Sequence, residues 1–229
     1  MTSYEIAGRT VTMPVEVRDA SAGTVLYEVD AGAAAVLLPG DAFEIVEVTP
    51  GRAHANLAVI DYRDNDLGDY LEVGITLFVR PRAGGDPGTF ITRLPVNQEF
   101  TCEAGQRIWG FPKTVEDIAV EYSDTEATAT LRMDGELVFR LTVPRGGTDE
   151  LPELPMTTYT YLDGVPHATA FTQSGAEARL APGGEGVTLE LGDHPVAKEL
   201  ASLGLPAAPA LTTWVGRMRG TFGTAQALG

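Results

Sequence analysis

Hydrophobic and polar residues alternate over residues 69–80, where Leu, Val or Ile occupies every second position from Leu71 to Val79. Because successive side chains of a β-strand point to opposite faces, the alternation predicts a strand with one face in the core. The other face carries Tyr70, Glu72, Gly74, Thr76 and Phe78. Glu72 lies among aromatic residues with a glycine beside it, so we expect this face to line a cavity. The alternative is a glutamate that faces solvent.

Most of the remaining chain has the pattern of short strands between Gly- and Pro-rich turns. This pattern is typical of an antiparallel sheet folded into a barrel or a sandwich. Asp134-Gly135 and Asp163-Gly164 each lie between two such strands, and Asp-Gly readily adopts the positive φ angles of a two-residue hairpin turn. A third hairpin is predicted to join residues 176–180 to residues 187–191.

Helix signals are few. Asp30 is expected to cap a short helix over residues 31–38, and Asp193 is expected to cap a second one over residues 195–203. We find no internal repeat, linker or change of composition along the chain. The sequence therefore predicts one domain, residues 1–229, that is mainly β with a few short helices.

The composition excludes several classes of partner. A formal net charge of −16 disfavours nucleic acid and anionic membranes, because both are bound mainly through basic patches. Cys102 is the single cysteine, and the three histidines show no metal-ligand spacing, so neither a disulfide nor a metal site is expected. The first residues lack a signal-peptide pattern, and no apolar stretch approaches the roughly 20 residues that span a bilayer. We expect a cytoplasmic protein.

Lys113, one of two lysines, ends the apolar run at residues 108–113, which follows a strand and a predicted polar, glycine-broken turn. Burial among apolar groups disfavours an ammonium and lowers the lysine pKa from its ordinary value of about 10.4. The resulting neutral amine attacks carbonyl carbons, so Lys113 is a candidate Schiff-base nucleophile. The alternative is a lysine that lays its methylene stem on an aromatic surface and keeps its head in water.

Two segments resemble the acetoacetate decarboxylase family. Residues 104–113, Ala-Gly-Gln-Arg-Ile-Trp-Gly-Phe-Pro-Lys, are similar to the family segment in which a glycine leads to an aromatic-Pro-Lys step with the Schiff-base lysine. Residues 68–72, Gly-Asp-Tyr-Leu-Glu, resemble its Tyr-x-Glu strand. The resemblance is strongest over residues 68–122. It implies an antiparallel β-cone or double barrel with the lysine inside a closed, apolar interior.

The resemblance also implies a reaction. Lys113 would convert the ketone of acetoacetate or a related β-keto acid into an iminium, which accepts the electrons released when CO2 departs. Glu72 would orient the lysine or steer proton transfer, and Trp109 and Phe111 would line the substrate site. This chemistry requires no metal and no organic cofactor. By the same resemblance, we expect a homo-oligomer that acts on a small keto acid.

The sequence departs from the family pattern next to the lysine. Thr114 occupies the place of a second lysine whose charge is associated with a low pKa of the nucleophile. Burial of Lys113 is one way to lower its pKa without that neighbour. A helical turn from Pro112 through Ile118 is another, because the positive end of a helix disfavours a nearby ammonium.

The residue that holds the substrate carboxylate is less clearly marked. The family uses an arginine near the pocket entrance, and Arg18 is the residue at the corresponding place in the chain. Arg93 and Arg107 are the alternatives.

Two other functions remain open from the sequence. The first is the same lysine chemistry applied to aldol addition or dehydration of small keto acids, which the absence of a second lysine favours. The second is a β-barrel that binds a small apolar or carbonyl ligand without turnover.

Overall fold

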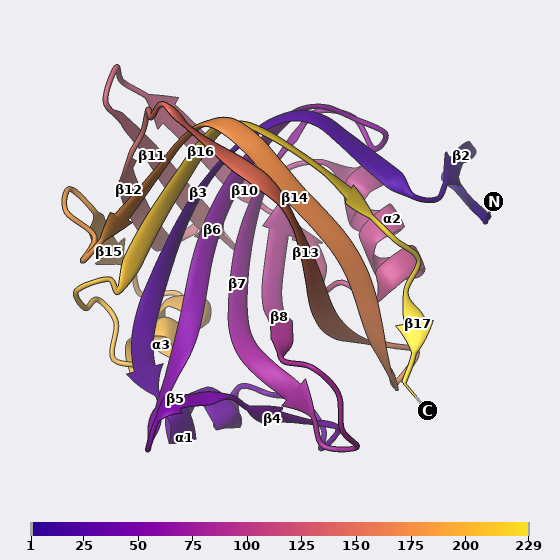
Figure 1. The fold of residues 1–229 in the computed structure, drawn as a ribbon, viewed down its shortest axis with the longest axis horizontal. Helices are drawn as coiled ribbons and strands as arrows, with labels where there is room; N and C mark the ends of the chain where they lie inside the picture. The colour runs from indigo at the N-terminus through magenta and orange to yellow at the C-terminus, as the bar shows by residue number, and fades with distance from the viewer. Residues whose placement is uncertain (1, 229) are drawn as a thin grey trace.

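A seven-stranded β-barrel forms the centre of the structure (Figure 1), a computed structural model that describes residues 2–228. The strands follow the order β7-β6-β3-β16-β14-β13-β8, and β8 also pairs with β7, which closes the barrel. Every pair is antiparallel except β8 with β13. The strands are β3 (Val15–Asp30), β6 (Arg52–Asn65), β7 (Tyr70–Pro81), β8 (Gly88–Val96), β13 (Asp149–Leu162), β14 (Val165–Pro182) and β16 (Leu211–Phe222).

A four-stranded antiparallel sheet packs against the outside of the barrel. It has the order β10-β11-β12-β15, with bounds β10 (Asp117–Tyr122), β11 (Glu126–Met133), β12 (Glu136–Pro144) and β15 (Thr188–Leu191). Its apolar side chains, among them Leu131, Phe139 and Leu141, join the outward-facing residues of β3, β6 and β7 in one buried core. The interior of the barrel therefore stays free of this core.

The short strands are β1 (Ser3–Ile6), β2 (Arg9–Thr12), β4 (Phe43–Ile45), β5 (Glu47–Thr49), β9 (Lys113–Val115) and β17 (Gln226–Ala227). Of these, β1 and β2 form a separate two-stranded sheet, and the others pair with strands of the barrel sheet. Among them, β9 runs parallel to β8 and carries Lys113 at its first position. The mainly β fold predicted from the sequence is confirmed.

Two of the three predicted hairpins are present. Asp134-Gly135 connects β11 to β12, and Asp163-Gly164 connects β13 to β14, with positive φ angles at all four residues. The third prediction is wrong. Residues 176–180 belong to β14, which pairs with β16, whereas β15 pairs with β12. The loop between β14 and β15 thus crosses from the barrel to the outer sheet.

The two predicted helices are present in slightly shorter form. They are α1 (Ala31–Val36), where the Asp30 carboxylate accepts from the Ala33 amide at 2.7 Å, and α3 (Pro195–Ser202). The cap of α3 is His194 rather than the predicted Asp193. No helix within residues 2–228 is long and apolar enough to cross a membrane.

The longest helix, α2 (Glu99–Trp109), lies where the sequence predicted a glycine-broken turn. Gln98 caps its N-terminus by accepting from the Thr101 amide at 2.7 Å, and Gly110 ends it in the left-handed conformation. The helix buries Ile108 and Trp109 against the end of the barrel. Its position beside the barrel is visible in Figure 1.

Candidate active site

A cavity of about 470 Å³ occupies the interior of the barrel. Its wall includes Tyr70, Glu72, Gly74, Thr76 and Phe78, so the predicted second face of the β7 strand does line a cavity. The wall is mostly apolar. Within residues 2–228, its charged side chains are Glu72, Lys113 and Arg219.

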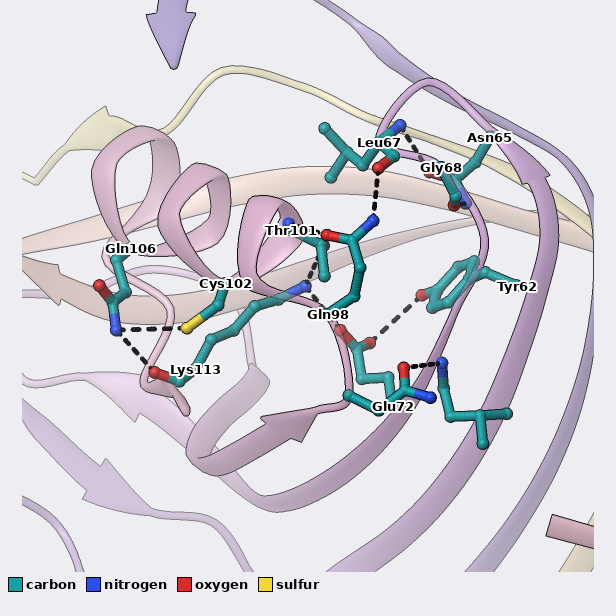
Figure 2. Close-up of polar contacts among 12 residues, drawn as sticks. Tyr62, Asn65, Leu67, Gly68, Glu72, Gln98, Thr101, Cys102, Gln106 and Lys113 are labelled. Atoms are coloured by element: carbon teal, nitrogen blue, oxygen red, sulfur yellow. Dashed lines mark hydrogen bonds and ion pairs between the residues drawn. The ribbon is translucent and has the colours of Figure 1, made fainter. Parts of the chain in front are cut away.

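The backbone around Lys113 is held by the end of α2. The Gly110 amide donates to the Gln106 carbonyl at 3.1 Å, and the left-handed Gly110 turns the chain back toward the barrel. The Gln106 side-chain amide donates to the Lys113 carbonyl at 2.7 Å. Leu94 of β8 pairs with Lys113 across the sheet. The lysine side chain therefore starts from a fixed backbone and extends past α2 into the barrel (Figure 2).

Gly105 leaves room for the lysine stem. A Cβ atom at this position of α2 would lie 2.6 Å from Cδ and 2.9 Å from Cε of Lys113. Both distances are shorter than a van der Waals contact. The helix accordingly has glycine at a site where alanine would otherwise favour the helical conformation.

We expect Gly105→Ala to displace the Lys113 amine and to lower the rate of adduct formation with keto acids by about 10²-fold. The measurement is single-turnover trapping of the adduct with borohydride. Gly32→Ala in α1 is the matched control, because this helical glycine does not line the cavity and its new Cβ would approach only the Asp30 carboxylate, at 3.1 Å. If Gly105→Ala formed the adduct as fast as the unsubstituted protein, glycine at this position would not be needed to accommodate the Lys113 stem.

The Lys113 amine lies in a buried polar cluster. Its Nζ atom is 2.8 Å from Oε2 of Glu72 and donates to Oγ1 of Thr101 at 3.0 Å. The centre of the Tyr70 ring is 4.8 Å from Nζ. Tyr62 donates to Oε1 of Glu72 at 3.3 Å (Figure 2). Lys113 and Glu72 are 3% and 6% exposed, so the ion pair is shielded from bulk water.

The pairing with Glu72 reverses the expected direction of the lysine pKa. Burial is the largest single influence and lowers the pKa of Lys113, but the Glu72 carboxylate and Tyr70 together outweigh it. The pKa is therefore raised above its ordinary value. The prediction of a neutral amine in the resting protein is wrong, because the sequence argument weighed burial but not the effect of the Glu72 charge on the lysine pKa.

The second expected cause of a low pKa is also absent. Residues 112–118 form no helical turn; they contain β9 and the start of β10. Thr114, at the second position of β9, is exposed and points away from the buried amine. The charge state of Lys113 thus depends on the cluster inside the barrel.

Burial raises the pKa of both tyrosines beside the ion pair. For Tyr62, the Glu72 charge acts in the same direction as burial. For Tyr70, the nearby Lys113 opposes the rise without cancelling it. Both hydroxyl groups therefore keep their protons at neutral pH, and Tyr62 serves as a hydrogen-bond donor to the carboxylate.

Trp109 and Phe111 line the cavity on either side of Gly110. Their rings stack with centroids 5.3 Å apart, and the Trp109 indole donates to the Gly223 carbonyl at 2.7 Å. The two residues are 2% and 5% exposed. They form a rigid apolar wall, as the sequence interpretation required of them.

Arg18 lies away from the cavity, which corrects its assignment as the carboxylate-binding residue. It is half exposed and forms ion pairs with Asp64 at 2.8 Å and Asp66 at 2.6 Å. Arg93 pairs with Glu199, and Arg107 pairs with Glu103. None of the three arginines lines the cavity. Their guanidinium groups are engaged by carboxylates on other surfaces.

Arg219 is the arginine that does line the cavity. On β16, the register with β3 shifts on both sides of Met218, between Val215 and Gly220. A bulge of this kind interrupts the strict alternation of a strand and redirects side chains. As a result, Met218 and Gly220 line the cavity although Thr213, an odd number of positions from Met218, lines it too; Arg219 also borders the cavity but is exposed to solvent. Alternation alone would place Arg219 on the opposite face from its neighbours, so the sequence pattern does not reveal it.

Comparison with protein families matches residues 4–226 to the acetoacetate decarboxylase (ADC) family. The chain belongs to the acetoacetate decarboxylase family. Membership indicates an enzyme that acts on small keto acids. Comparison with curated proteins gave no significant match.

Solved structures share the acetoacetate decarboxylase fold with this chain. The acetoacetate decarboxylase of Legionella pneumophila is 18% identical, with a TM-score of 0.68 and coverage of 97% of this chain and 92% of that one. The enduracididine biosynthesis enzyme MppR, complexed with pyruvate, is 17% identical, with a TM-score of 0.68; the match covers 97% of this chain and 93% of the MppR chain. An acetoacetate decarboxylase-like enzyme from Sphingomonas wittichii RW1 is 15% identical, with a TM-score of 0.59 and coverage of 97% and 96%.

Within residues 2–228, no group of three or more His, Cys, Asp or Glu side chains is arranged to hold a metal ion. The polar groups gathered around Lys113 at this acetoacetate decarboxylase-type cavity are an amine, a carboxylate, two phenols and a threonine hydroxyl. Such a set can exchange protons and attack a carbonyl carbon.

Proposed function

We propose that the protein is a Schiff-base lyase that decarboxylates a β-keto acid, with Lys113 as nucleophile and Glu72 as its proton partner. The observation that carries the proposal is the buried Nζ of Lys113, 2.8 Å from Glu72 at the wall of an apolar cavity. We propose that residues 1–229 act as one catalytic domain. Membership of the acetoacetate decarboxylase family supports this assignment.

The first step is proton transfer from the Lys113 ammonium to Glu72, which yields a neutral amine and a neutral carboxylic acid. The amine attacks the ketone carbon, and the carbonyl oxygen takes up protons and leaves as water. Glu72, now protonated, is placed to supply a proton to this oxygen. The product is an iminium whose nitrogen carries the positive charge.

The second step is the loss of CO2. The bond between the carboxyl carbon and the α-carbon breaks, and its electron pair moves to the iminium nitrogen to form a neutral enamine. A proton then adds to the α-carbon, and water hydrolyses the iminium to release the ketone and regenerate the amine. The apolar wall formed by Trp109 and Phe111 favours this step, because the carboxylate loses its charge when it becomes CO2.

Arg219 is proposed to hold the substrate carboxylate before CO2 departs. We expect Arg219→Gln to lower kcat/KM roughly 10- to 100-fold, mainly through KM, because a charge-assisted hydrogen bond contributes about 1.5–3 kcal/mol. Arg18→Gln is the matched control and should leave kcat/KM within about twofold. Equal losses in the two variants would remove Arg219 from this role.

Condensation of keto acids is the second candidate function. An enamine that protonates after CO2 loss also attacks aldehydes, so the same lysine serves both reactions. Two observations favour this candidate. Thr114 replaces the family's second lysine, and MppR has also been solved with the condensation product of pyruvate and imidazole 4-carboxaldehyde.

The test is reductive trapping. The protein is incubated with acetoacetate, pyruvate or larger keto acids in the presence of borohydride, and the modified residue is located by mass spectrometry. A reduced adduct on Lys113 is expected. Parallel assays of CO2 release and of C–C bond formation with an added aldehyde separate decarboxylation from condensation. Absence of any adduct across the panel would favour a ligand-binding barrel without turnover.

A further inference from the structure

The cavity extends well beyond the lysine. Along β7, its wall continues from Glu72 through Gly74 and Thr76 to Phe78. Thr76 lies four positions after Glu72, which corresponds to about 13 Å along a strand. Cavities of about 300–1,000 Å³ enclose drug-sized ligands, and at about 470 Å³ this one is several times larger than acetoacetate. The site therefore has room that the smallest keto acids leave empty.

Two small residues keep the middle of the cavity open. Ala58 of β6 pairs directly with Gly74 of β7, and both line the cavity between the lysine and its far end. A Cβ atom added to Gly74 would meet Cβ of Ala58 and Cδ1 of Leu94 at 3.6 Å. Larger side chains at this pair would occupy the passage. Because these two paired residues are small, the part of the cavity at Lys113 is continuous with the part beyond them.

The far end of the cavity offers neutral hydrogen-bonding groups. Asn56 pairs with Thr76 across β6 and β7, and Thr24 pairs with Thr213 across β3 and β16. All four residues line the cavity. Oγ1 of Thr76 is buried and has no hydrogen-bond partner within residues 2–228. A buried hydroxyl without a partner is costly, so a ligand group that bonds to it gains affinity.

We infer that the substrate is a keto acid with a long, largely apolar substituent that ends in a neutral hydrogen-bonding group. The keto carbon lies at Lys113, the substituent passes over the Ala58–Gly74 pair on the cavity wall, and its polar end bonds to Thr76 and Asn56. Because no charged side chain of residues 2–228 lines this far end, a hydroxyl or amide fits there better than an ion. The inference rests on the proposed Schiff-base function and specifies its substrate class.

Three stable 2-oxo acids test the inference by borohydride trapping at Lys113. They are pyruvate, 2-oxo-4-phenylbutanoate and 2-oxo-4-(4-hydroxyphenyl)butanoate. In the unsubstituted protein, the two long probes are expected to give half-maximal adduct at concentrations at least about tenfold lower than pyruvate, because they bury more apolar surface. The hydroxylated probe is expected to be favoured over the phenyl probe by a further factor of about three to ten.

Two variants locate the effect. Ala58→Leu is expected to weaken trapping of both long probes at least tenfold and to leave pyruvate within about threefold. Thr76→Val removes the hydroxyl at constant shape, and it should abolish the preference for the hydroxylated probe without changing the phenyl probe. Gly74→Ala provides a milder obstruction if Ala58→Leu does not fold, as judged by circular dichroism.

The outcomes separate the two proposals. No adduct with any probe in the unsubstituted protein overturns the Schiff-base function itself. An adduct with pyruvate but no preference for the long probes overturns only the substrate inference. An equal loss of pyruvate and long probes in Ala58→Leu also overturns it, because the pair would then control access rather than accommodate the substituent.

Discussion

Lys113→Met will show no measurable keto-acid adduct, and its turnover will fall by at least about 10⁴-fold. Methionine has a similar length and an apolar stem, but it offers no nitrogen to form the iminium on which both proposed reactions depend. The measurement is kcat on any keto acid that the unsubstituted protein converts, together with mass spectrometry after borohydride treatment. An adduct that persists at full yield in this variant would place the chemistry on another residue.

Loss of activity must be separated from loss of structure. Lys113→Met leaves the Glu72 carboxylate buried without its cation, and removing one partner of a buried pair costs about 3–5 kcal/mol of stability. The double variant Lys113→Met with Glu72→Gln removes the stranded charge, so it should recover most of the free energy of unfolding in urea. It should remain inactive. Recovery of stability without recovery of turnover would assign the lysine a chemical role beyond a structural one.

Glu72→Gln will move the pH dependence of adduct formation to lower pH and will reduce the maximal rate about 10²- to 10⁴-fold. The Glu72 carboxylate raises the pKa of Lys113, while burial lowers it. Without the carboxylate, burial dominates, so the amine becomes free at lower pH. The rate falls because the amide cannot accept and return the proton. The measurement is the initial rate of borohydride-trapped adduct from acidic to alkaline pH.

Glu103→Gln is the control for this experiment. Glu103 is an exposed carboxylate that pairs with Arg107 on α2, and it is 44% exposed at its side chain. Its replacement should leave both the pH profile and the rate unchanged. A shift to higher pH in Glu72→Gln would contradict the direction assigned to the lysine pKa.

The raised pKa of Lys113 also makes the stability of the folded protein depend on pH. Because the pKa of Lys113 is higher in the folded protein than in the unfolded chain, the folded protein binds the lysine proton more tightly than the unfolded chain does. The resulting stability is fully present below the ordinary lysine pKa of about 10.4 and is lost as the pH rises through the folded pKa. The stability advantage of the unsubstituted protein over Glu72→Gln should therefore shrink only at strongly alkaline pH.

The parts of the fold that the sequence predicted depend on local rules. The alternation on β7 identified both faces of the strand, because a side chain's face is fixed by its position. Asp134 and Asp163 marked their hairpins, since each is followed by a glycine that accepts positive φ. The burial of Lys113 followed from its apolar neighbours and from the family resemblance.

The parts that were missed depend on contacts between distant segments. Helix α2 contains Gly105, which lowers helix propensity and is explained only by the lysine stem that crosses it. The charge state of Lys113 follows from Glu72, which lies 41 positions earlier in the sequence and meets it inside the barrel. Met218 and Gly220 face the cavity because of a bulge in β16, and no local pattern marks where a strand gains its extra residue.

The irregularity in β16 has an implication for how such barrels diversify. Its surplus residue lies between Val215 and Met218, so removing one residue there would turn Met218, Gly220 and Phe222 away from the chamber and Arg219 toward it. A single codon deletion would thereby replace an apolar edge of the chamber by a cationic one. The amine of Lys113, which is carried by β9, would be left in place.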